Sequence, residues 1–359
     1  MSDLARAVSR LVTAATENES DRALRSAVDA VMRAFDARKP AVVREAIRLL
    51  DAGIARATGR AAQVLYLALG ALVEAGAPPE LAWTAAGRDL PQTLAGATRF
   101  AAACVRLSGE QDVERAIVAS GAAVAKKKPS DAAAWTALPS RSLAAVACLL
   151  ASRSLRKKVK KTKLSEAAFA LEDAVTEVGL LSQVLKILDG EPFLVLHPES
   201  RRGFRITVQD LASNVELYVL LMETLVGDPK KGLIAGKSID AKLGVILRSS
   251  AAGNKKPQKA PLHFHMLSWV SLAEDGSLAP DAAADDTQWI WLEGLPAEVP
   301  KFGKERIVLL TKAPSASSFT VEPTMANLEP TIRVESKLSS AEVDKILAKL
   351  GKAVAKFAR

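Results

Sequence analysis

LLSQVLKILDGEPFLVLHPESRRGFRITV, residues 180–208, is the stretch at which the chain changes from helical to β-like sequence. Apolar residues recur at helical spacing up to Leu188, and the pattern stops at Asp-Gly-Glu-Pro, residues 189–192. A compact apolar run (193–197), a polar turn and an alternating run (204–208) follow, which together predict a β-hairpin. The stretch therefore predicts two regions: an all-α region over 1–190 and an α+β domain over 191–359.

The region before the break is alanine-rich and predicts successive amphipathic helices. Short connections between consecutive helices favour antiparallel neighbours, so we expect a bundle or an irregular α-solenoid. No repeat length keeps its key positions along this region. Residues 139–157 and 165–189 each predict one continuous helix. The broad apolar face of the second favours burial between the two regions, which argues against a flexible linker.

The region after the break predicts strands with few intervening helices. Apart from the hairpin, the strand candidates are 262–272, 287–292, 306–311 and 331–334. Helices are expected at 213–226, at 240–248 and from Ser340 to the end, with Ser339 and Glu342 at capping-box spacing. This order predicts an α+β domain with an antiparallel or mixed sheet, packed against the helical region and ending in an amphipathic helix.

Composition limits the classes of protein that the chain can represent. The 359 residues are 49% hydrophobic, and no stretch reaches the roughly 18–20 uninterrupted apolar residues of a membrane span. The N-terminus lacks the residue order of a secretory signal, and Cys104 and Cys148 both lie in apolar helical sequence, as free thiols in a reducing compartment do. We therefore expect a cytoplasmic protein without a transmembrane segment. The C-terminal helix is expected to dock on its own domain, so a membrane-surface role is not expected.

Histidines form the sharpest local chemical feature. His263 and His265 stand two apart on a predicted strand, so both imidazoles are expected on one face, shared with Leu267 and Trp269. Two imidazoles are half of a zinc site, and His197 is the remaining histidine of the chain. The spacing selects no carboxylate to complete a set. Structural or surface histidines are the favoured interpretation, and no metal is predicted, with His197, His263 and His265 as the candidates if one binds.

A basic segment at residues 153–163, RSLRKKVKKTK, carries much of the net charge of +9. It holds seven basic residues and no acidic one: Arg153, Arg156, Lys157, Lys158, Lys160, Lys161 and Lys163. Such a segment is most often a solvated helix end, and otherwise contacts an acidic protein surface or the phosphates of nucleic acid. No aromatic side chain is interleaved for stacking on bases.

Two further features are weaker. Residues 232–238, GLIAGKS, resemble a phosphate loop but have three rather than four residues between the glycines, so no nucleotide cofactor is predicted. Trp289 and Trp291 are expected to share one face of a strand, which is more often a core than a ligand platform. No catalytic motif is complete.

The order of features over residues 177–298 resembles a family of uncharacterised bacterial proteins found mostly in high-GC species. The similar pieces are LDGEPFLVL (188–196), GFR (203–205), NVEL (214–217), GDP (227–229), LSW (267–269), and WIW (289–291) followed by EGLP (293–296). The resemblance covers about a third of the chain and brings no activity with it. It implies that the second half is a recurrent bacterial module, and it does not include His263 or His265.

These features favour a non-enzymatic bacterial adaptor or assembly component that binds protein partners through its helical surface and the basic segment. The first alternative is an enzyme of unknown class with a pocket between the two halves, near His197, Arg205, Asn214, Glu216 and the 263–265 strand. The second alternative is a nucleic-acid-associated protein that uses residues 153–163. The identity of the partner and the oligomeric state are beyond the sequence.

Overall fold

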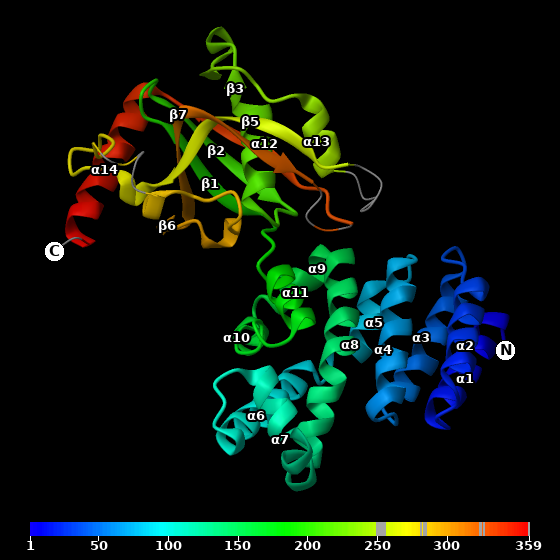
Figure 1. Ribbon diagram of the computed structural model, residues 1–359. Coiled ribbons are helices and arrows are strands. Elements are labelled where there is room, and N and C mark those ends of the chain that lie inside the picture. Colours follow the sequence, from blue (N-terminus) through cyan, green and yellow to red (C-terminus); the bar gives the residue numbers. More distant parts are fainter. Residues whose placement is uncertain (249–255, 281, 283–285, 323–324, 326, 358–359) are drawn as a thin grey trace. The chain divides into compact units, whose positions relative to one another are not determined.

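The computed structural model describes residues 1–248, 256–280, 282, 286–322, 325 and 327–357. It divides into two compact units, Met1–Leu185 and Lys186–Arg359. They are called the helical unit and the sheet unit below, and they run from blue to green and from green to red in Figure 1. The fold class is confirmed: a helical region is followed by an α+β region with a mixed sheet.

The helical unit consists of eleven helices. They are α1 (Asp3–Thr16), α2 (Asp21–Ala34), α3 (Pro40–Ile54), α4 (Gly59–Glu74), α5 (Pro79–Gly87), α6 (Leu90–Ser108), α7 (Val113–Lys127), α8 (Pro129–Ala151), α9 (Arg153–Val159), α10 (Leu164–Phe169) and α11 (Thr176–Leu185). Local chemistry sets several starts: the hydroxyls of Ser2 and Ser20 accept hydrogen bonds from the first turns of α1 and α2, and Pro40 opens α3.

Helix α8 is the core helix of this unit and packs against α4, α5, α6, α7 and α11 (Figure 1). Small residues let its neighbours approach: a Cβ on Gly70 of α4 would lie 3.4 Å from the backbone of Ala144, and one on Gly96 of α6 would lie 2.9 Å from Ala134 Cβ. Among the described residues α8 is the one helix long and apolar enough to cross a bilayer, and 56% of that apolar window is buried within the protein. A core helix accounts for this as well as a span does, so no clear transmembrane span is present in the part described.

Two long helices expected from the sequence are each divided. In place of a helix over 165–189, α10 and α11 are separated by turns at 170–175, and Leu188 forms a bridge with Leu211. The turns bring the Glu172 carboxylate to the Ser182 hydroxyl, which donates to it, and leave Phe169 66% exposed instead of on an inner face. The helix expected over 139–157 ends at Ala151, because the hydroxyl of Ser152 caps a new helix, α9.

The main sheet of the sheet unit has the strand order β5-β7-β1-β2-β8, with β6 paired on β7. The strands are β1 (Glu191–His197), β2 (Arg202–Gln209), β5 (Gln258–Ser268), β6 (Lys301–Phe302), β7 (Glu305–Val321) and β8 (Thr331–Leu338). The hairpin of β1 and β2 is confirmed, with Glu191 opposite Val208 and His197 opposite Arg202. The β1–β7 pair is parallel and the other pairs are antiparallel, so the sheet is mixed.

Smaller elements connect and cover the sheet. They are α12 (Asn214–Leu225), β3 (Val226–Gly227), η1 (Pro229–Lys231), β4 (Ile234–Ala235), α13 (Ala241–Leu247), η2 (Trp269–Ser271), η3 (Asp286–Gln288), η4 (Pro296–Glu298) and α14 (Ser340–Phe357). The strand expected at 287–292 is wrong: Trp289 makes only an isolated bridge with Leu267, and Trp291 lies in a turn region.

Two separate cores cover the two faces of the sheet. Alternate residues of each strand face opposite ways, so Phe193 and Val195 of β1 pack with α12, whereas Leu194 and Leu196 pack with α14. The apolar residues of α14, including Val343 and Leu350, are buried in the second core. The C-terminal helix therefore docks on its own unit.

Candidate functional site

The three histidines do not meet. His197 is on the same face of β1 as Phe193 and Val195, the face toward α12. Its ring meets the Phe264 ring edge-on, with 5.8 Å between the centroids. His265 follows Phe264 in β5 and therefore faces the α14 side, where its ring lies 4.3 Å from that of Trp289. His263 lies at the irregularity of β5 between Leu262 and Phe264. No group of three or more His, Cys, Asp or Glu side chains could hold a metal ion among the residues that the structure describes.

Burial lowers the pKa of both His197 and His265 below the ordinary value of 6.5. The Nδ1 atom of His197 lies 2.8 Å from the Ser200 hydroxyl and accepts from the Ser200 backbone N–H at 3.2 Å. The Nδ1 atom of His265, by contrast, is buried and has no hydrogen-bond partner among the residues that the structure describes. Both imidazoles are neutral at physiological pH, and His265 is the one left unsatisfied.

The polar residues expected around a catalytic pocket hold the fold together instead. The Glu216 carboxylate is 1% exposed and accepts from the backbone N–H groups of Ala212 and Ser213 as part of a capping box. The amide of Asn214 donates to the Trp291 carbonyl at 2.7 Å. Arg205 pairs with Glu305 across the sheet at 2.9 Å. Each of these three side chains therefore makes a structural contact within the sheet unit.

The basic segment is only partly available at the surface. Arg153, Lys157, Lys158, Lys161 and Lys163 are exposed and Lys160 is half-buried. Arg156 is 1% exposed, and its guanidinium donates to the carbonyls of Leu149 and Leu150 at the end of α8. The buried Arg156 side chain therefore caps the C-terminal end of α8 and is not available to contact a partner or nucleic acid.

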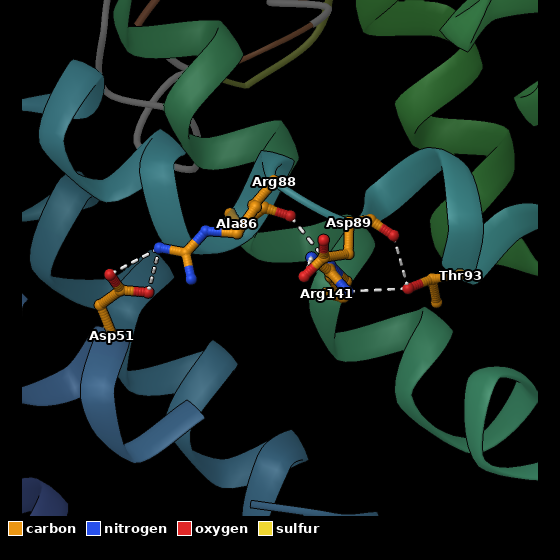
Figure 2. Close-up of polar contacts among 6 residues, drawn as sticks. All are labelled: Asp51, Ala86, Arg88, Asp89, Thr93 and Arg141. Carbon is orange, nitrogen blue, oxygen red and sulfur yellow. Dashed lines mark hydrogen bonds and ion pairs between the residues drawn. The ribbon is translucent and has the colours of Figure 1, made fainter. Parts of the chain in front are cut away.

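A buried arginine of α8 is held by polar contacts from neighbouring helices (Figure 2). Arg141 of α8 donates from Nε to the Ala86 carbonyl at 2.9 Å and from Nη1 to the Thr93 hydroxyl at 2.7 Å. Its Nη2 lies 3.9 Å from the Asp89 carboxylate, and its guanidinium stacks over the Tyr66 ring at 5.2 Å. Burial lowers the pKa of Arg141, and the nearby Tyr66 and Asp89 act against that shift.

Through these contacts Arg141 of α8 ties together α4, α5 and α6, and Arg141, Tyr66 and Asp89 line a cavity of about 280 Å³. On its rim, Arg88 donates to both oxygens of Asp51 at 2.7 and 2.9 Å. Burial raises the pKa of Tyr66. Because these cations are matched by acceptors of the protein itself, the cavity is best explained as a structural polar core rather than a binding site.

A groove of about 460 Å³ runs between α2 and α4 on the helical unit. Its lining is mostly apolar, with charged side chains at the ends: Asp21, Leu24, Arg25, Val28, Asp29, Arg60, Val64, Leu67, Ala68 and Ala71. Leu67, near the middle of α4, is 49% exposed and belongs to this apolar lining. The apolar residues recur three and four apart on both helices, so the groove has the shape that a third helix packs into.

A second cleft, of about 490 Å³, borders the edge strand β5 of the sheet unit and is called the aromatic cleft. It is lined by Tyr218, Leu262, Phe264, His265, Met266, Trp289, Ile290, Trp291, Leu292, Glu293, Ser315, Ser317, Ser318 and Phe319. Of the positions expected near an enzyme pocket, only Phe264 and His265, from the 263–265 strand, are among the described lining residues of the cleft. Its size and its apolar lining with few polar groups are typical of small-ligand sites.

Comparison with known proteins adds no assignment: no family model matches the chain, and no curated protein or solved structure gives a significant match. The resemblance of residues 177–298 to a bacterial family therefore stays a prediction. Sequence reasoning missed both the α2–α4 groove and the aromatic cleft. The pair Trp289 and Trp291 was the available signal for the cleft, but it was interpreted as part of a sheet core.

Proposed function

We propose that the protein is a non-enzymatic bacterial cytoplasmic adaptor that binds an amphipathic helix of a protein partner in the α2–α4 groove. The observation that supports this most directly is Leu67, a half-exposed leucine on an apolar floor formed with Val28 and Val64. Apolar side chains spaced as i, i+3 and i+4 along a groove are the anchors by which helix-in-groove recognition works.

The charged ends of the groove favour a partner helix with both signs of charge beside its apolar stripe. Asp21 and Arg60 already form an ion pair with each other. Asp29 and Arg25, on the exposed side of α2, supply one charge of each sign. Such rim charges contribute little affinity but fix the direction in which a helix lies.

The test compares Leu67→Asp with Val118→Asp in affinity capture from the source cells. Val118 is 85% exposed on α7 and outside the groove, so it is a matched control for adding a surface carboxylate. One stoichiometric protein should be captured by the wild type and by Val118→Asp and lost, with affinity lower by about tenfold or more, from Leu67→Asp.

Two results would overturn the proposal. One is retention of every stoichiometric partner by Leu67→Asp. The other is a dimer of the purified protein, measured by light scattering, that Leu67→Asp converts to a monomer, because the groove then binds a second copy of the chain.

The exposed part of the basic segment supports the second candidate, nucleic-acid binding. Lys157, Lys158, Lys161 and Lys163 are exposed within a stretch that contains no acidic residue. Replacing these four by glutamine should lower affinity for duplex DNA and flatten its dependence on salt, by about 0.9 in the log–log slope per lost phosphate contact. Filter binding over a salt series measures this, and unchanged affinity in the variant removes the candidate.

A further inference from the structure

The aromatic cleft concentrates side chains that are rare in this chain. The whole protein has nine Phe, five Trp and two Tyr. Five of these line the one cleft: Tyr218, Phe264, Trp289, Trp291 and Phe319. The Trp289 and Trp291 rings lie 5.0 Å apart, and the Tyr218 and Phe319 rings 5.1 Å apart. The cleft therefore presents several π faces and ring edges to a ligand at once.

The charge of the cleft has a single sign. Glu293 is the one charged side chain among the lining residues that the structure describes, and it is exposed. The other polar side chains of the lining are uncharged: His265, whose pKa is lowered by burial, Tyr218, the two tryptophans, and serines 315, 317 and 318. Ring faces carry negative electrostatic potential, so the carboxylate and the rings act in the same direction.

Hydrogen bonds hold the aromatic walls in place. The Tyr218 hydroxyl accepts from the backbone N–H groups of His263 and Phe264, at 2.8 and 3.2 Å. The Ile290 N–H donates to the Met266 carbonyl at 2.8 Å, which fixes the segment that carries both tryptophans. The buried amide of Asn214, described above, holds the carbonyl of Trp291. A ligand therefore meets walls that are already formed, which lowers the entropic cost of binding.

We propose that the aromatic cleft binds an organic cation carried on an apolar body, with Trp289, Trp291 and Tyr218 facing the cation and Glu293 as its counter-charge. Quaternary ammonium and guanidinium groups have this chemistry, because they are weakly hydrated and spread their charge over an apolar surface. A neutral apolar molecule makes the apolar contacts but lacks the charge that the rings and Glu293 attract. An anion is repelled by the same carboxylate and ring faces. The source of the cation is either a free small molecule or a side chain of a protein segment.

The first experiment titrates the full chain with three probes of nearly equal shape: choline, neutral 3,3-dimethylbutan-1-ol and anionic 3,3-dimethylbutanoate. Binding is followed by the ¹⁵N–¹H signals of the five tryptophan indoles. Choline should shift the Trp289 and Trp291 signals with a Kd on the order of 1–10 mM, given its few heavy atoms. The alcohol should bind about tenfold more weakly and the carboxylate more weakly still.

Variants connect binding to the named residues. Glu293→Gln keeps the shape of the side chain and should weaken choline several-fold, and Trp291→Leu should weaken it about tenfold. Both positions are exposed, Trp291 at 48%, so folding is not at risk. Glu274→Gln, an exposed carboxylate of the same unit outside the cleft, should leave the affinity unchanged.

A second arm identifies the source of the cation. Short peptides bearing arginine, lysine or trimethyllysine at their centre are titrated into the protein, and their affinities are compared with that of choline. A peptide that binds at least tenfold tighter than choline assigns the cleft to a protein segment, and equal or weaker peptide binding assigns it to a free small molecule. The proposal is overturned if the neutral alcohol binds as tightly as choline, if Glu293→Gln and Trp291→Leu both bind choline as the wild type does, or if no saturable shift occurs.

Discussion

Two clusters of buried polar side chains, one in each unit, differ in how far their hydrogen bonds are satisfied. In the helical unit, the Arg141 guanidinium donates to a carbonyl and a hydroxyl, lies near a carboxylate and stacks on a ring. In the sheet unit, three buried atoms have no hydrogen-bond partner within the described part of the chain: His265 Nδ1, Nε1 of its neighbour Trp289 and the hydroxyl of the cross-strand Thr311. The first cluster is complete in itself, and the second is not.

This difference separates architecture from a site. A buried polar group that is satisfied by the protein contributes to stability and specifies the packing of its neighbours. A group left unsatisfied costs free energy in the folded state, and proteins concentrate such groups where function requires them. The comparison therefore predicts large effects on stability from substitutions at satisfied positions and small effects at unsatisfied ones.

Arg141→Met should produce the largest loss. The change keeps an unbranched side chain but leaves the Ala86 carbonyl and the Thr93 hydroxyl without their donor, so we expect the free energy of unfolding to fall by about 2–4 kcal/mol. Urea denaturation of the full chain followed by circular dichroism measures the loss. Arg141→Lys should recover only part of it, because one ammonium group lacks the forked geometry of the guanidinium. A loss below about 0.5 kcal/mol would show that this cluster does not stabilise the helical unit.

Tyr218→Phe should have the next largest effect and tests the comparison inside the aromatic cleft. The Tyr218 hydroxyl is the acceptor for two backbone N–H groups of β5, so its removal leaves both unpaired, at a cost of about 1–3 kcal/mol. Hydrogen exchange of the His263 and Phe264 amides should accelerate in the variant while the helical unit is unchanged. Unaltered protection of these two amides would contradict the assigned role.

His265→Phe should change stability by less than about 1 kcal/mol. The substitution keeps an aromatic ring against Trp289 and removes a buried nitrogen that has no partner. The same denaturation experiment measures it beside Tyr218→Phe, whose side chain lines the same cleft. If His265→Phe costs as much as Tyr218→Phe, the imidazole has a partner that the comparison does not include.

How much of this was visible in the sequence depends on the range of the interactions. The hairpin of β1 and β2 and the capping box of Ser339 and Glu342 were predicted correctly, because their partners are close in the chain. The turns at 170–175 were missed because they depend on the contact of Glu172 with Ser182, which a continuous apolar pattern conceals. The opposite faces of His197 and His265 follow from the strand order, which no local pattern specifies.

The aromatic cleft was missed for the same reason on a larger scale. Its walls come from α12, β5, the segment around Trp289 and the end of β7, which only the folded sheet unit brings together. For the basic segment, the sequence showed the charges but not which of them are buried. Its charges were evident, but the burial of Arg156 against the end of α8 depends on the helix break at Ser152.

The smallest expected effect is a dependence of stability on pH that belongs to the sheet unit. His197 and His265 have pKa values lowered by burial, whereas in the unfolded chain they titrate near 6.5. As the pH falls through 6.5 the unfolded state takes up protons that the folded state does not, so the stability that is fully present above this pH is progressively lost below it.

Urea denaturation at about pH 7.5 and pH 5.5, above the range in which carboxylates titrate, should give a lower free energy of unfolding at the lower pH. His265→Phe should reduce this difference, and combining it with His197→Asn should nearly remove it. A difference that persists in full in the double variant would assign the pH dependence to other groups and would leave both imidazoles without a titration that is coupled to folding.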